Sequence, residues 1–229
     1  MSKQTMHSIA LTERDVRAVL AGEQTVFRRE VKAARGRQAE WLSPALLTAS
    51  PSAEVCSVRG ALGVQLEHPK GGPLGWVRCP YGGVGDQLWV QETWAYYGGD
   101  EYLYQCDPDA VAYRATYADD VRVPLAQRWY GKPPGGRWRP SIHMPPWASR
   151  ITLNVVNVRV ERLHGIDDAD ALREGVKFYD PEHLWDVPEP PFTPREVFNH
   201  LWARFKGVAS WRSNPWVWRI EFKAKEKAR

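Results

Sequence analysis

The hydrophobic and polar positions along the chain predict three helices, each with its own capping residues. Each helix begins at a Thr or an Asp that is suited to the N-cap position, and acids follow in its first turn. Each ends at a glycine, the residue that most easily takes the left-handed conformation after a helix. The predicted helices begin and end at Thr12 and Gly22, at Asp167 and Gly175, and at Thr193 and Gly207.

Runs of β-branched and aromatic residues between these helices predict strands. The longest is Ile151–Leu163, whose apolar positions change phase between Val155 and Val156, which indicates a bulge or burial on both faces. The run Trp216–Phe222 alternates apolar and polar residues, as a strand with one buried face does. Shorter candidates are Leu88–Trp94, Ala112–Thr116 and the extended run that ends at Arg28 and Arg29.

This order of elements favours an α+β fold over a doubly wound α/β sheet, because helices do not regularly separate successive strands. We expect a small, mostly antiparallel β-barrel with helices packed on it, in a single domain over residues 1–229. The Gly-, Pro- and polar-rich stretches at about 33–80 and 96–146 are too long for structureless loops in a compact domain. We therefore expect them to be elaborations of the barrel with some structure of their own.

The net charge of +4 is unevenly distributed. Residues 28–37 and the tail 223–229 are basic, and the rest of the chain is slightly acidic. Two basic patches on such a body indicate contact with a polyanion at defined places, and a solvated loop and a solvated tail are the alternative. Most of the twelve tryptophans are expected in the core, and one or two near a binding surface would suffice to stack on bases.

Several other classes of protein are disfavoured by the composition. The three cysteines, Cys56, Cys79 and Cys106, include no Cys-x-x-Cys pair, so neither disulfides nor a zinc site is expected. His143 has no ligand partner at metal spacing, and no metal or cofactor is expected. The chain lacks both an apolar run of ~18 residues and a signal peptide, which favours a cytoplasmic location in a bacterium or a phage-infected cell.

Four short segments resemble the ASCH family, a branch of the PUA-like β-barrels, and they occur in the family's order. They are Val19–Arg29, Gly85–Val90, Ala171–Val176 and Trp216–Lys223. A closer likeness, to the longer ASCH proteins of phages and prophages, lies in Cys79–Gly82, Glu92–Trp94 and Trp138–Arg150. The resemblance implies a PUA-like barrel that holds RNA or a flipped base in a groove beside the first helix.

The resemblance also allows a test of enzymatic function, position by position. Some small ASCH proteins are amidohydrolases of acetylated cytidine that use a Thr nucleophile, an activating Lys and a Glu acid/base. Here the Lys falls on Gln24, the Thr on Phe27 and the Glu on Glu174. Gln cannot take a proton from a hydroxyl and Phe carries no nucleophile, so only Glu174 is left as a catalytic candidate. An amidohydrolase is therefore disfavoured, and whether the chain is an enzyme stays open.

The leading hypothesis is binding of RNA or a modified base without turnover. Arg28 and Arg29 are expected to reach phosphates, Gln24 to hydrogen-bond a base edge and Phe27 to stack on a base. Thr25, the nearest hydroxyl, belongs to the same candidate surface. An ion pair between Arg29 and Glu174 and simple core packing of Phe27 are the structural alternatives.

A second candidate surface is the segment 137–150, in which cations and aromatic residues alternate as they do in proteins that bind single strands. Its candidate binding residues are Trp138, Arg139, His143 and Trp147. The alternative is a loop that covers one end of the barrel. Two further hypotheses are a hydrolase of the ASCH type, either amidohydrolase or ribonuclease, and a phage accessory protein that binds a host protein.

Overall fold

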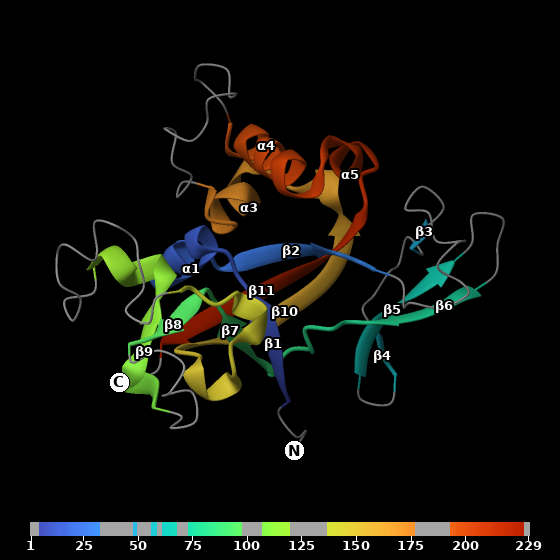
Figure 1. Ribbon diagram of the computed structural model, residues 1–229. Helices are drawn as coiled ribbons and strands as arrows, with labels where there is room; N and C mark the ends of the chain where they lie inside the picture. The colour runs from blue at the N-terminus through green and yellow to red at the C-terminus, as the bar shows by residue number, and fades with distance from the viewer. Residues whose placement is uncertain are drawn as a thin grey trace.

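The computed structural model describes residues 5–32, 48–49, 56–58, 61–67, 73–97, 107–119, 137–176 and 193–226. Its centre is a five-stranded sheet in the order β1-β7-β10-β11-β2 (Figure 1). The strands are β1 (Met6–Ala10), β7 (Gln87–Gln91), β10 (Ile151–Arg162), β11 (Trp216–Glu226) and β2 (Val26–Glu30). β1 and β7 run parallel, and the other neighbours are antiparallel.

The fold is therefore mixed α+β, as the sequence predicts. The expected closure into a barrel is not seen among the described strands, because β1 and β2 lie at opposite ends of the pairing order. Closure depends on contacts between segments far apart in the chain, and the local patterns that identify strands carry no information on them.

The two longest strands, β10 and β11, form the spine of the sheet. They pair from Ile151 opposite Glu226 to Arg162 opposite Trp216. Their register shifts between Val155 and Asn157, which confirms the bulge that the change of hydrophobic phase predicts. β11 extends beyond its predicted end at Phe222 to Glu226.

The predicted helix starts are confirmed. Thr12 caps α1 (Glu13–Leu20), Asp167 caps α3 (Asp168–Arg173) and Thr193 caps α4 (Pro194–Lys206). Full capping boxes form at α1 and α4, where an acid three residues after the cap bonds back to the cap's backbone N–H. A short helix that the pattern did not predict, α5 (Val208–Arg212), follows α4 after Gly207. No helix in the described ranges is long and apolar enough to cross a membrane.

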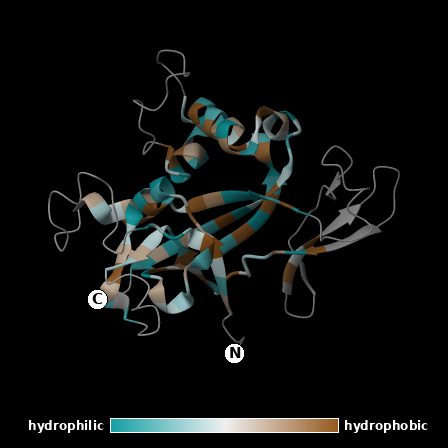
Figure 2. Cartoon of the chain, viewed as in Figure 1, coloured by the Kyte–Doolittle hydropathy of each residue, from teal (hydrophilic) through white to brown (hydrophobic). Residues whose placement is uncertain are grey.

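The sheet buries both of its faces, and successive residues of β11 point to opposite ones. On one face Trp218, Ile220 and Phe222 pack with Val16 and Val19 of α1. On the other face Val217 packs with residues of α3 and α4. Figure 2 shows the resulting alternation of hydrophobic and hydrophilic residues along the strands.

Both predicted elaborations contain secondary structure. In the first, β3 (Thr48–Ala49), β4 (Cys56–Val58), β5 (Ala61–Glu67) and β6 (Pro73–Arg78) make a separate small sheet. In Figure 1 it lies to one side of the main sheet. In the second, β8 (Trp94–Tyr96) pairs with β9 (Val111–Tyr113). Short 3-10 turns cover Pro108–Ala110, Arg114–Asp119, Ser141–His143, Pro146–Ala148 and Leu163–Gly165.

Two predicted strands are correct in place but wrong in extent. Leu88–Trp94 is divided, because β7 ends at Gln91 and Trp94 begins β8. Ala112–Thr116 is cut short where the 3-10 turn begins at Arg114. In both cases the strand ends where the chain turns away from its neighbouring strand. Local propensity does not reveal where this pairing ends.

Candidate functional site

The turn after α1 and the turn after α3 meet at the edge of the sheet. Gln24 and Glu174 form an isolated antiparallel bridge, and the N–H of Thr25 donates to the carbonyl of Arg173 at 3.0 Å. Residues directly opposite in such a bridge have Cβ atoms about 5 Å apart and point to the same side. Two segments separated by some 150 residues thus place an amide and a carboxyl next to each other.

Two glycines and one arginine hold this junction. Gly22 and Gly175 each have φ of +72°, the left-handed conformation that turns the chain after each helix. Arg14 of α1 donates through Nη2 to the carbonyls of Glu174 and Gly175, at 3.1 and 2.7 Å. The position of Glu174 is therefore set by its backbone as well as by its side chain.

Arg28, in the middle of β2, is fully buried and bound by three carboxylates. Its guanidinium lies 2.6 Å from Glu161, 2.6 Å from Asp170 and 2.9 Å from Glu174. These contacts raise the pKa of Arg28 further, although burial opposes the charged form. The paired side chains fix Arg28 as a structural cation and leave it no free edge for a phosphate.

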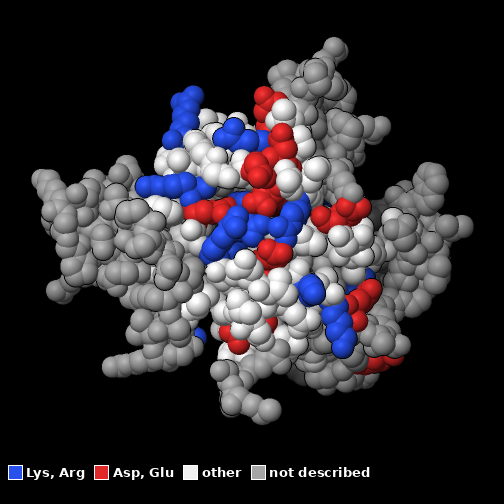
Figure 3. All heavy atoms as spheres, turned by 180° about the vertical axis from the view of Figure 1, so that it is seen from behind, with Lys and Arg blue, Asp and Glu red and all other residues white. Residues whose placement is uncertain are grey.

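Arg28 belongs to a row of three arginines that lie directly opposite one another across three strands. Arg159 of β10 pairs with Arg219 of β11, which pairs with Arg28 of β2. Such a row repels itself unless acids separate the charges. Asp170 of α3 does so by binding both Arg28 and Arg219, and these two guanidinium groups hold its pKa well below the ordinary range despite burial. Figure 3 shows basic and acidic side chains gathered side by side across the middle of one face.

Glu174 is the acid of the site whose pKa is raised, opposite to the shift of Asp170. Burial raises its pKa to about 7, and the nearby Arg28 and Arg29 only partly offset this. Its Oε1 accepts from Nη1 of Arg28 at 2.9 Å. Within the described part of the chain no hydrogen bond reaches its Oε2, so one oxygen of this buried carboxyl is available to a ligand.

The hydrogen bonding of the Gln24 side chain is also incomplete. Its Nε2 donates to the carbonyl of Val26 at 3.3 Å, which orients the amide. Its Oε1 is buried and has no partner among the described residues. Reversing the amide would bring its oxygen against the Val26 carbonyl, so the bonding favours the orientation with the oxygen unpaired. A buried acceptor without a donor costs about 1–3 kcal/mol, which a ligand donor would recover.

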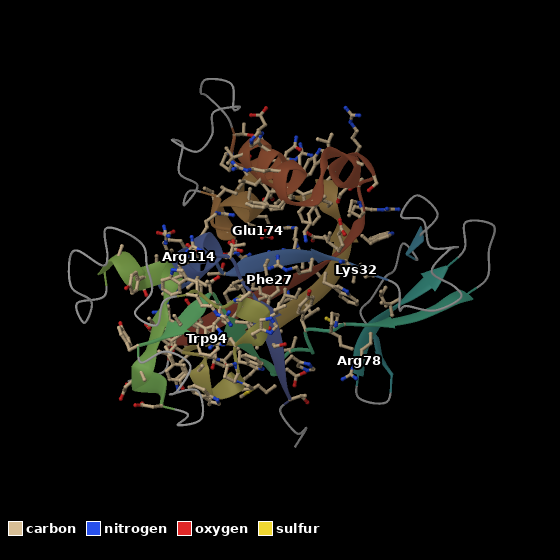
Figure 4. All side chains as sticks on the ribbon, in the orientation of Figure 1. Phe27, Lys32, Arg78, Trp94, Arg114 and Glu174 are labelled. Carbon is tan, nitrogen blue, oxygen red and sulfur yellow. The ribbon has the colours of Figure 1, made fainter. Side chains whose placement is uncertain are left out.

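A cavity of about 370 Å³ lies at this point, between α1, β2, the end of α3 and α4. Gln24, Arg29 and Glu174 all line it. In Figure 4, Glu174 lies between β2 and the helices, whereas Phe27 lies on the other side of the strand. The volume falls within the ~300–1,000 Å³ typical of small-molecule sites. Its remaining lining residues are Ala10, Thr12, Arg14, Asp15, Arg28, Phe198, Leu201, Trp202, Phe205 and Lys206.

Phe27 and Arg28 have environments opposite to those expected of a nucleic-acid contact. Phe27 is fully buried, with its ring 5.9 Å from Tyr81 and 5.3 Å from Phe222, so it packs in the core and offers no surface to a base. Arg28 lines the cavity but is fully engaged by carboxylates. Of the predicted basic patches, residues 33–37 and 227–229 lie outside the described residues.

Of the other residues predicted to bind nucleic acid beside α1, Arg29 lies at the cavity and Thr25 does not. Arg29 lines the cavity, and its guanidinium also lies 5.2 Å from the Phe27 ring. The alternative, an ion pair between Arg29 and Glu174, is not seen among the described residues, and Arg28 pairs with Glu174 instead. Thr25 lines a different cavity, of about 360 Å³, and its hydroxyl accepts from Arg173 at 3.3 Å.

The segment 137–150 does not join this cavity. Trp138 packs edge-on against Tyr117, Arg139 lies 5.6 Å above the Trp94 ring, and Trp147 packs against Trp94 and Tyr96. His143 is exposed. At the end of the segment, the buried Arg150 forms a two-point ion pair with Glu92 at 2.9 and 3.0 Å. These contacts pack the segment against β8, whereas the predicted alternative was a loop over one end of a barrel that is not seen among the described strands.

Sequence reasoning missed the contribution of α4. Phe198, Leu201, Trp202, Phe205 and Lys206 repeat at helical spacing and line one wall of the cavity. The sequence pattern shows one apolar face on this helix, which looks the same whether the face meets the core or a cavity. The sequence signal for a cavity wall is Phe205, which extends the apolar face into the last turn of the helix beside Lys206. In the structure the Phe205 side chain is 58% exposed.

The described residues contain no group of three or more His, Cys, Asp or Glu side chains that could hold a metal ion. Cys79 is buried, which raises its thiol pKa to about 11. Comparison of the chain with known proteins finds no matching family model, no matching curated protein and no matching solved structure.

Proposed function

We propose that this protein binds nucleic acid by taking up one base in the cavity beside α1, without chemical turnover. The observation that carries this proposal is that Gln24, Arg29 and Glu174 line one cavity of about 370 Å³. The likeness of four segments to ASCH proteins supports it, and we accordingly propose a PUA-like relationship for the fold.

The lining of the cavity suits a base and its phosphate. The ring of Phe205 is exposed beside the buried Trp202, which provides an aromatic surface for stacking. The exposed Lys206 and the half-buried Arg29 supply positive charge at the same cavity. The two unfilled acceptors of Gln24 and Glu174 lie deeper, where a base edge would meet them.

Binding of a labelled single strand at increasing salt tests the proposal. For single strands, the logarithm of the affinity should fall with the logarithm of the salt concentration by about 0.7 for each phosphate contacted. Fluorescence anisotropy with RNA and DNA oligonucleotides measures this slope. Salt-insensitive binding, or no binding to any strand, would remove the proposal.

A charge-matched pair of variants connects binding to the cavity. Lys206→Gln removes a cation that lines the cavity, and Arg212→Gln removes an exposed cation of α5 that does not. We expect weaker binding and a shallower salt slope for Lys206→Gln, and native behaviour for Arg212→Gln. Equal losses in both variants would mean that the interaction is diffuse.

A hydrolase is the second candidate function, favoured by one observation. Burial raises the pKa of Glu174 to about 7, where a carboxyl group can donate or accept a proton at neutral pH. Incubation with acetylated cytidine and with labelled RNA, each compared with Glu174→Ala, tests the two reactions. Product formed by the native chain and not by the variant would establish turnover.

A further inference from the structure

The two unfilled acceptors of the cavity lie on neighbouring side chains. The bridge between Gln24 and Glu174 places both side chains on the same side with Cβ atoms about 5 Å apart. Gln24 uses its Nε2 on Val26, and Glu174 uses its Oε1 on Arg28. Gln24 Oε1 and Glu174 Oε2 are thus left without donors among the described residues, and both residues line the cavity.

Such a pair of acceptors requires two donors at a similar spacing on the ligand. Arg28 lies 2.9 Å from Glu174 and favours its ionised, accepting form, which prevails above the raised pKa of about 7. Among the bases, guanine presents a ring N–H beside an amino group on one edge. Adenine and cytosine place a ring acceptor beside their amino group, and uracil places one N–H between two carbonyls. Each of these three would set an acceptor against Gln24 or Glu174.

We propose that the cavity selects guanine, with the ring N–H and amino group donating to Glu174 and Gln24. The inference rests on the proposed binding of nucleic acid and specifies the base. The ionised Glu174 accepts one of these N–H groups through Oε2 in a short, charge-assisted hydrogen bond, and the amide oxygen of Gln24 accepts the other. The aromatic face of α4 holds the ring without regard to its edge, so the discrimination comes from the two acceptors.

A series of single-base substitutions tests the proposal without altering the protein. A labelled uridine-tract RNA carries one central guanine, inosine, adenine or cytosine, and anisotropy measures each affinity at one salt concentration and at a pH well above the Glu174 pKa of about 7. We expect guanine to bind about tenfold or more tightly than adenine or cytosine. Inosine keeps the ring N–H and lacks the amino group, so it should fall between them.

A variant then assigns the preference to the carboxyl. Glu174→Gln should abolish the preference for guanine while keeping the salt-dependent binding of the uridine tract. Asp168→Asn makes the same chemical change at an exposed position of α3 outside the cavity and should retain the preference. If Glu174→Gln does not fold, as circular dichroism would reveal, the base series on the native chain decides alone.

The outcomes separate this inference from the function on which it rests. Equal affinity for all four RNAs with a steep salt dependence overturns the selection of guanine and leaves nucleic-acid binding in place. Tighter binding of adenine or cytosine also overturns it. Absence of binding to every RNA overturns both.

Discussion

At the scale of single residues, the most instructive position is Arg28. The short run Val26–Glu30 does not alternate cleanly between apolar and polar residues, so its sequence alone does not say which side chains face the core. Its register with β11 decides, because Phe27 lies opposite Ile220 and Arg28 lies opposite Arg219. The pairing with β11, almost 200 residues away in sequence, therefore determines which side chains of β2 face the core.

The buried position of Arg28 predicts a large loss of stability on its removal. Arg28→Ala leaves Glu174 without its cation and weakens the contacts of Glu161 and Asp170. Breaking a buried ion pair from one side costs about 3–5 kcal/mol, and we expect the lower end because Arg219 and Arg159 still bind these two acids. Urea unfolding measures the difference, with Arg212→Ala as the exposed control. A loss below about 1 kcal/mol would contradict a structural role for Arg28.

The raised pKa of Glu174 predicts a particular pH dependence of stability. Burial places this pKa at about 7 in the folded protein, above its ordinary value of 4.5. The stability that the raised pKa contributes is therefore fully present below about pH 4.5 and is lost as the pH rises through 7.

The Glu174→Gln variant has no titratable group at this position, so it should not lose stability as the pH rises. Relative to the native chain, the variant should gain stability from pH 4.5 to 7, by up to about 1.4 kcal/mol per pH unit. Urea unfolding at a series of pH values checks this, with Asp168→Asn as the matched change. A difference that does not vary with pH would show that Glu174 is ionised throughout.

At the scale of elements, the sequence predicts what local chemistry determines. Thr12, Asp167 and Thr193 mark the three helix starts because a capping side chain bonds within its own first turn. The bulge in β10 is equally local, since an extra residue shifts the apolar phase of the strand itself. The four strands within residues 48–78 were not resolved individually by the pattern, because their small sheet depends on pairing between short runs.

The glycines that end α1 and α3 offer a matched test of how the two turns dock. Gly22 and Gly175 have the same φ of +72°, but a Cβ on Gly22 would meet nothing within 4 Å. A Cβ on Gly175 would lie 3.0 Å from the Cβ of Ala18 and 3.3 Å from that of Gln24. Gly22→Ala should therefore cost only the backbone strain of about 1–2 kcal/mol.

Gly175→Ala should cost clearly more than Gly22→Ala, because it adds a clash between the two turns to the same strain. It should also weaken any ligand bound between Gln24 and Glu174, which Gly22→Ala should leave unaffected. Denaturant unfolding of the two variants gives the comparison directly. Equal costs would indicate that the two turns can move apart without penalty.

At the scale of the whole molecule, the candidate site exists only because distant segments converge. Gln24, Arg29 and Glu174 were candidates only through an expected resemblance to ASCH proteins, and the structure shows that these three line one cavity. The aromatic wall was not foreseen, because a helical stripe looks the same whether it meets the core or a cavity. The order of the strands in the sheet could not be predicted from the sequence either, because β1 pairs with β7 across some 80 residues.

Substitution of Phe205 separates the proposed binding role of the α4 wall from its structural role. Phe198 and Trp202 are buried and serve the core between α3, α4 and β11, so truncating them would confuse the two. Phe205 is 58% exposed and lines the cavity without being part of either main core cluster. Phe205→Ala should therefore change the free energy of unfolding by no more than about 0.5 kcal/mol.

The same change should weaken the binding of a single strand by about 1–3 kcal/mol, the contribution of stacking one base on an aromatic ring. Val208→Ala is the matched control, because Val208 is 53% exposed in the neighbouring helix and does not line the cavity. Anisotropy and thermal unfolding on both variants give the two readings. Native affinity in the Phe205→Ala variant would show that the base does not stack on α4. Weaker binding with unchanged stability would show that it stacks against this wall.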